Sequence, residues 1–237
     1  VDRHQHHALI QHGNRAAFLH QPRKQGLRRL KEGVPLCIGA VLQFARLGVA
    51  LAADLDDAFV EILKEVSGRD LPQKYAAERG RLVDAYVDCH KYVFGKRALV
   101  YGEEDFVIGM VSFLKEIGIR PVIAASGGES GIFKTEIESL LEGDDEVRIL
   151  EGGDFETMRE VAAESNLDIV IGHSKGYYIA RELKIPIVRV GFPIHDRVGG
   201  PRMRHLCYSG TQETFDRIVN ALLDHTQENS PIGYKYM

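Results

Sequence analysis

Residues 168–197 constrain the fold more strongly than any other part of the chain. Two short apolar runs, 169–171 and 187–190, bracket a stretch with residues at helical spacing: Tyr178, Ile179 and Leu183. Short apolar runs joined by a helix are typical of a parallel β-sheet that is buried on both faces. These thirty residues therefore predict two parallel strands connected by a helix.

The same alternation of apolar runs and amphipathic stretches continues through the second half of the chain. It predicts five strands, at 98–101, 122–125, 147–150, 169–171 and 187–190. Helices are expected between them: one follows Asp105 and ends at Gly118, Asp154 is expected to cap another, and the last begins near Thr211. The pattern indicates an α/β fold with a parallel, doubly wound sheet of the flavodoxin or Rossmann type.

An N-terminal helical segment is expected before the sheet. Apolar residues recur there at helical spacing up to Gly68 (Phe59, Ile62, Leu63, Val66), and a second helix is expected from Pro72 to about His90. Residues 1–54 have no sustained apolar period and include five histidines near the start, so an irregular leader that is not native to the fold is expected. The predicted division is thus 1–54 leader, 55–94 helical segment and 95–237 parallel α/β domain.

Composition excludes several classes of protein. A formal net charge of −4 argues against a nucleic-acid partner, which normally meets a concentrated basic face. No uninterrupted apolar run reaches the roughly 20 residues that a membrane-spanning helix needs. Cys37, Cys89 and Cys207 form no paired motif, so neither a disulfide framework nor a zinc site is expected, and a reducing cytoplasm fits best.

Polar loops follow the predicted strands, where parallel sheets gather their ligands. The loop 172–176 offers His173, Ser174 and Lys175, which suits either an anion or an ordinary helix start. In the loop 191–197, Asp196 and Arg197 suit either an external contact or an internal ion pair. The loop 126–131 is glycine-rich but lacks the spacing of a phosphate-binding motif. In the loop 102–105, Glu104 and Asp105 are expected to cap the following helix.

Asp84 and Asp88 lie four residues apart in the helical segment, so their carboxylates are expected on one helix face. A hard cation such as calcium would suit the pair, with further oxygen ligands from elsewhere. The alternative is a solvated charged face, and the residues alone favour that alternative.

Seven segments together resemble the C-terminal part of a nitrogenase component 1 polypeptide, and most of all the β chain of the molybdenum-iron protein. The resemblance covers roughly residues 57–225. Two of the segments are Glu78-Arg-Gly-Arg-Leu-Val-Asp84 and Arg189-Val-Gly-Phe-Pro-Ile-His-Asp-Arg197, and the segments are specific only in combination. The other parts lie at 65–72, 88–90, 95–97, 102–109 and 171–176.

The resemblance implies a β-type subunit that supports ATP-dependent reduction of dinitrogen to ammonia. Its partners would be an α-type chain that holds the iron-molybdenum cofactor, a second β-type chain, and an iron protein that supplies electrons. An iron-sulfur relay cluster belongs to the complex, but the three cysteines do not match its ligands, so this chain alone is expected to hold no cofactor. Two alternatives stay open: the β-like chain of the cofactor-assembly scaffold, and a stand-alone small-anion-binding α/β domain.

The resemblance also bears on single residues. Asp84 and Asp88 match two acidic residues that bind a cation, calcium or iron, between two β chains, which reverses the preference for a solvated face. In α-type chains a histidine binds the active-site cluster, and Leu206 stands at the matching position. The sequence departs from the family at three positions: the family usually has asparagine at the position of His173, often phenylalanine at that of His195, and glycine at that of Cys207.

Overall fold

The five predicted strands form one parallel sheet. The computed structural model describes residues 53–141 and 146–232. Its strands are β1 (Arg97–Tyr101), β2 (Arg120–Ser126), β3 (Arg148–Glu151), β4 (Ile169–Gly172) and β5 (Ile187–Arg189). Their order is β3-β2-β1-β4-β5, and all four neighbouring pairs are parallel. The predicted parallel α/β sheet is therefore confirmed, and β1 is its central strand, between β2 and β4.

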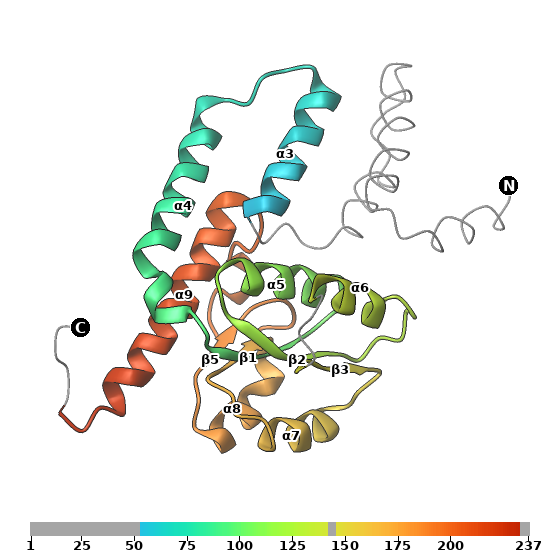
Figure 1. The fold of residues 1–237 in the computed structure, drawn as a ribbon, viewed down its shortest axis with the longest axis vertical. Helices are drawn as coiled ribbons and strands as arrows, with labels where there is room; N and C mark the ends of the chain where they lie inside the picture. The colour runs from blue at the N-terminus through green and yellow to red at the C-terminus, as the bar shows by residue number, and fades with distance from the viewer. Residues whose placement is uncertain (1–52, 142–145, 233–237) are drawn as a thin grey trace, which may run out of the picture.

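Helices cover both faces of the sheet (Figure 1). On one face α5 (Glu104–Glu116), α6 (Phe133–Leu140) and α9 (Cys207–Glu228) share an apolar core with the strands. On the other face a second core lies beneath α7 (Phe155–Ala163) and α8 (Tyr177–Leu183). Two single-turn helices, Ser174–Gly176 and Gly200–Arg202, complete this part. The strands are thus buried on both sides, as their nearly continuous apolar sequences indicate.

The predicted apolar faces of the helices are largely correct. The helix expected after Asp105 has five apolar residues at helical spacing, the last of them just beyond α5, and all five are buried: Val107, Met110, Val111, Leu114 and Ile117. Asp154 caps α7 through a 2.8 Å hydrogen bond from the Thr157 amide to its Oδ1. In α8 the buried residues are Ile179 and Ala180, whereas the Tyr178 side chain is 76% exposed and so lies outside the buried face.

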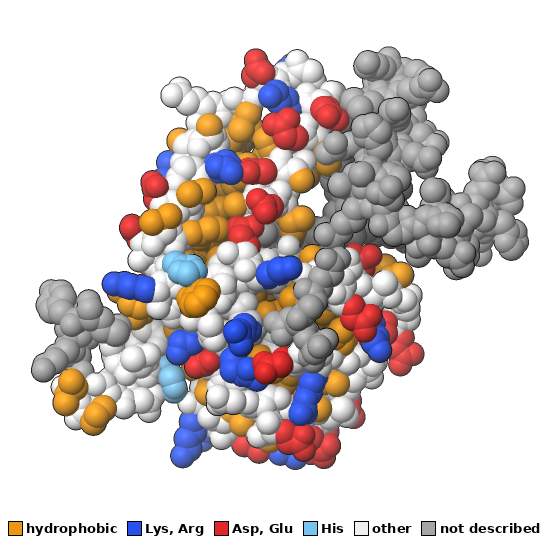
Figure 2. Space-filling model, viewed as in Figure 1, with side chains coloured by type: hydrophobic (Ala, Val, Ile, Leu, Met, Phe, Trp, Pro, Cys, Tyr) orange, Lys and Arg blue, Asp and Glu red, His pale blue; other side chains and the backbone are white. Residues whose placement is uncertain are grey.

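A helical hairpin precedes the sheet and rises away from it (Figure 1). It consists of α3 (Ala53–Ser67) and α4 (Gln73–Val93). The Tyr86 ring packs edge-on against Phe215 of α9, with ring centroids 4.9 Å apart. In α3, Ile62 is buried but Leu63 is 45% exposed, and the Val66 side chain lies outside the described residues. Figure 2 shows hydrophobic side chains among charged ones along this hairpin.

Residues 1–52 of the predicted leader, Cys37 among them, lie outside the described residues, whereas Ala53 and Asp54 are the first two residues of α3. The division at residues 54 and 94 stays a prediction. Helix α9 contacts both the hairpin and the sheet. Within 53–141 and 146–232, no helix is both long enough and apolar enough to cross a membrane.

Helix α9 begins four residues before the predicted start at Thr211. Ser209 and Gly210 are weak helix formers, so propensity does not indicate this first turn. The turn is held by packing, because Tyr208 is buried against the α3–α4 hairpin. Cys207 starts the helix with φ of +59°, a left-handed conformation that favours glycine.

We predict that Cys207→Gly stabilises the protein. A non-glycine residue in this conformation carries strain of order 1 kcal/mol, which glycine removes, and the resembled family has glycine here. Chemical denaturation should give an unfolding free energy about 1 kcal/mol higher for the variant. Cys207→Ala is the matched control, because it removes the thiol but keeps Cβ. An equal gain from Cys207→Ala would assign the effect to the thiol and contradict the backbone explanation.

Candidate functional site

The carboxyl edge of the sheet is the expected ligand position, and its centre lies between β1 and β4. The chain leaves β1 toward β2 on one side and later returns to add β4 on the other. Such a reversal opens a crevice above the strand ends in many parallel sheets. The loops that follow β1, β2, β4 and β5 therefore decide what this edge can bind.

The loop 172–176 is wrapped around Tyr101, the last residue of β1. The Tyr101 side chain is buried, its hydroxyl donates to the His173 carbonyl oxygen, and it accepts from the Gly176 amide at 2.9 Å. A Cβ atom at Gly172 or Gly176 would overlap the tyrosine ring. The conformation of this loop is thus determined by the Tyr101 side chain.

Ser174 and Asp196 join the two loops that the sequence singled out. The Ser174 hydroxyl donates to Asp196 Oδ1 at 2.5 Å and accepts from the His195 amide at 3.0 Å. His173 instead lies edge-on to the rings of Tyr101 and Phe155. The buried Ser174 hydroxyl is therefore a structural bridge between the loops, and its donor bond goes to a carboxylate.

Asp196 is held by an internal ion pair, the second of the two alternatives. Arg189 Nε lies 2.9 and 2.8 Å from the two carboxylate oxygens, and Arg189 Nη2 lies 2.7 Å from Oδ2. The Arg189 hydrogen bonds lower the pKa of Asp196 to about 2, and the Ser174 bond contributes in the same direction. Asp196 is thus ionised and paired at neutral pH, while Arg197 is more exposed and binds the Asp196 carbonyl oxygen at 2.6 Å.

The glycine-rich loop 126–131 already has anionic partners within the chain. The Ser130 amide donates to Glu104 Oε1 at 3.0 Å, and the Gly131 amide donates to Glu151 Oε1 at 3.2 Å. Glu104 therefore reaches across to this loop instead of capping α5 as expected, and the cap residue Glu103 makes no side-chain cap bond. The Ser130 and Gly131 amides, which a bound phosphate would need as hydrogen-bond donors, already donate to carboxylates of the chain.

Asp84 and Asp88 both lie exposed on α4, one turn apart. Across the described part of the chain, no three histidine, cysteine or acidic side chains cluster in a way that could hold a metal ion. Cys89 and Cys207 are free thiols on different helices, α4 and α9. The described residues therefore do not fit an iron-sulfur cluster, and any cation at Asp84 and Asp88 would need ligands from another chain.

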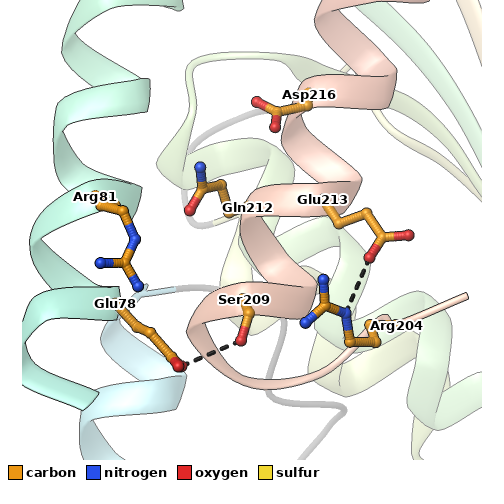
Figure 3. A pocket seen from close by; sticks show the side chains of 7 residues that line it. All are labelled: Glu78, Arg81, Arg204, Ser209, Gln212, Glu213 and Asp216. Atoms are coloured by element: carbon orange, nitrogen blue, oxygen red, sulfur yellow. Dashed lines mark hydrogen bonds and ion pairs between the residues drawn. The ribbon is translucent and has the colours of Figure 1, made fainter. Parts of the chain in front are cut away.

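A polar cavity of about 420 Å³ lies between α4 and α9, and no sequence pattern predicts it (Figure 3). Its walls carry both signs of charge: Glu78, Arg81, Arg204, Ser209, Gln212, Glu213 and Asp216. Ser209 donates to Glu78 at 3.1 Å, and Arg204 donates to Glu213 at 3.2 Å. The lining comes from two distant segments without a shared motif, which is why pattern reasoning misses it.

Comparison with known proteins gives a consistent family. The model of nitrogenase component 1 type oxidoreductases matches residues 53–223. The molybdenum-iron protein β chain of Methanothermobacter thermautotrophicus is 37% identical over 169 residues, which cover 70% of this chain and 37% of that one. The β chain of Rippkaea orientalis is 35% identical over 182 residues, covering 76% and 36%.

A solved structure supports the same relationship. A chain of nitrogenase Cp1 at pH 6.5 superposes with a TM-score of 0.77 and 29% sequence identity, covering 81% of this chain and 42% of that chain. This chain thus spans well under half the length of the relatives that it matches.

We predict that Gly172→Ala destabilises the protein by about 3 kcal/mol, because the added methyl group would overlap the buried Tyr101 ring and force it to move. Gly127→Ala is the matched control, because a Cβ atom there meets nothing within 4 Å. Denaturant titration of both variants measures the difference. Equal small losses would mean that Tyr101 does not determine the shape of the loop.

Proposed function

The chain belongs to the nitrogenase component 1 type oxidoreductase family, and we propose that it is the C-terminal part of a β-type subunit of a nitrogenase molybdenum-iron protein. The family match over residues 53–223 carries this proposal. In the assembled complex the subunit supports ATP-dependent reduction of dinitrogen to ammonia, with electrons from a partner iron protein. The complex supplies the iron-sulfur relay cluster and the iron-molybdenum cofactor.

The role proposed for this chain is support of a partner. Its loops at the carboxyl edge bind one another through Tyr101, Ser174 and Asp196, so they form a fixed surface instead of an open ligand site. Three apolar side chains project from the same region or close to it: Phe192, Val198 and Leu206 are 63%, 101% and 53% exposed. Exposed apolar groups beside a rigid loop suit contact with another protein, and we assign this surface to the α-type chain.

Two alternatives differ from this proposal in their partners. The β-like chain of the cofactor-assembly scaffold would have the same fold and would bind a scaffold α-type chain. A stand-alone small-anion-binding domain would need free amides at the carboxyl edge, and the Ser130 and Gly131 amides already bind Glu104 and Glu151. The internal pairing at this edge favours a subunit over an anion-binding domain.

A cation between two β-type chains is the proposed role of Asp84 and Asp88. Both carboxylates are exposed on one face of α4, so they are accessible to a second subunit. Oxygen ligands of this kind suit calcium, and iron is the alternative. We further propose a cytoplasmic complex without a nucleic-acid or membrane partner.

The partner proposal predicts a stable complex with an α-type chain of the catalytic nitrogenase. The full chain is mixed separately with the catalytic and the scaffold α-type chains, and sedimentation velocity measures association. Phe192→Asp combined with Val198→Asp should weaken binding at least tenfold, because charges would be buried at the contact. Ile232→Asp, at an exposed apolar position near the end of α9, is the control.

Two results of this experiment would decide against the catalytic subunit. Preference for the scaffold α-type chain would select the assembly alternative. A monomer in both mixtures would select the stand-alone domain.

The cation proposal predicts that Asp84→Ala with Asp88→Ala abolishes calcium-dependent association of the assembled complex. Removing both carboxylates leaves the cation without ligands from α4. Calorimetry measures calcium affinity, and sedimentation measures association between β-type chains. Asp70→Ala, at an exposed carboxylate in the loop between α3 and α4, is the control. Unchanged affinity and association in the double variant would reject the site.

A further inference from the structure

A buried carboxyl group lies where α3 meets α9. Asp56 is only 1% exposed, and its Oδ2 accepts a 3.0 Å hydrogen bond from the Thr211 hydroxyl. The other oxygen, Oδ1, is buried and has no hydrogen-bond partner among the described residues. A buried carboxylate in this situation is costly, because one oxygen has lost water without gaining a donor.

The groups that surround Asp56 make ionisation still less favourable. From α5, Glu116 accepts the amides of Ala53 and Asp54 at 2.9 and 3.3 Å, so its charge stays beside the start of α3. From α4, the buried Tyr86 hydroxyl lies near the Glu116 carboxylate. The remaining titratable neighbours are Asp54 and Asp57 of α3, Glu78 and Arg79 of α4, and Cys207 and Tyr208 of α9.

The positively charged side chain near Asp56, Arg79, already pairs with another carboxylate. Arg79 binds Asp57, with Nε 2.8 and 2.9 Å from the two carboxylate oxygens. Asp57 also accepts a 2.6 Å hydrogen bond from the Tyr208 hydroxyl. Neither Asp56 nor Glu116 forms an ion pair with a lysine, arginine or histidine of residues 53–141 and 146–232. A proton on Asp56 is therefore the simplest way to neutralise the junction.

We propose that α3 packs against α5 and α9 only while Asp56 carries a proton, so that rising pH releases the helix. The proposal goes beyond the function proposed above and does not depend on it. Release would also free Glu116 from the first amides of α3 and would expose the Tyr86 hydroxyl. The hairpin would then be anchored through α4 alone, whose packing on α9 includes the Tyr86 and Phe215 rings.

The direction of the pH effect follows from the two states of Asp56. In the packed helix the pKa of Asp56 is raised from 3.8 to about 8: burial is the main cause, Glu116 and Asp57 act in the same direction, and the Thr211 hydrogen bond opposes them. In the released helix Asp56 returns to its ordinary pKa near 3.8. Packing therefore weakens by up to about tenfold per pH unit as pH rises between these two values, and levels off above them.

Hydrogen exchange on the full chain tests the proposal. Protection of the α3 amides, corrected for intrinsic exchange rates, is measured by mass spectrometry from pH 5.5 to 9. In the wild-type chain it should fall by up to about tenfold per pH unit below pH 8. Asp56→Asn should remove this slope, because the amide does not titrate. Asp70→Asn, the same change at an exposed position, should keep it.

A second variant keeps the test decisive if Asp56→Asn does not fold. Thr211→Val removes the donor that favours the ionised carboxylate, so the fall in protection should extend to higher pH. The proposal would be overturned by a wild-type slope in Asp56→Asn, or by a fall in protection in Thr211→Val that levels off at the same pH as in the wild-type chain. The proposal would also be overturned if protection of the α3 amides at pH 9 differed between sodium and potassium buffers. A bound metal cation would then neutralise Asp56 in place of the proton.

Discussion

Burial of Tyr101 at the end of the central strand organises the whole carboxyl edge of the sheet. Its ring occupies the space that two side chains at positions 172 and 176 would need, so glycine is required at both. Its hydroxyl then fixes the backbone of the loop by bonding to His173 and Gly176. Once this loop is fixed, Ser174 can reach Asp196, and the loop after β5 is held in turn.

These contacts decide what the edge can do. A ligand site on a parallel sheet needs amides or charged groups that are unpaired before the ligand arrives. Here the Ser130 and Gly131 amides bind carboxylates, and Asp196 is paired with Arg189. The polar groups therefore make the loops rigid, while Phe192 and Val198 stay exposed. Such an edge suits recognition of a protein surface better than turnover of a small molecule.

The sequence predicts the sheet well because buried parallel strands have continuous apolar runs that local patterns reveal. It also predicts the Asp154 cap, which involves only neighbouring residues. It does not show that Tyr178 is exposed, because the short α8 buries Ile179 and Ala180 and helical spacing alone does not fix the inward face. The partners of Glu104, Asp56 and Asp196 depend on segments brought together by folding: Thr211 lies 155 residues from Asp56. Local patterns contain no information on such pairs.

Helix α9 makes the hairpin and the sheet dependent on each other. Phe215 and Ile218 lie in the core above the strands, and Phe215 also contacts Tyr86 of α4. The start of α9 places Tyr208 against Asp57 and Thr211 against Asp56, so two neighbouring acidic residues of α3 contact the same part of α9. A change in the protonation of Asp56 therefore acts directly on the start of α9. Because that helix continues across the sheet, the stability of the hairpin is coupled to the fold as a whole.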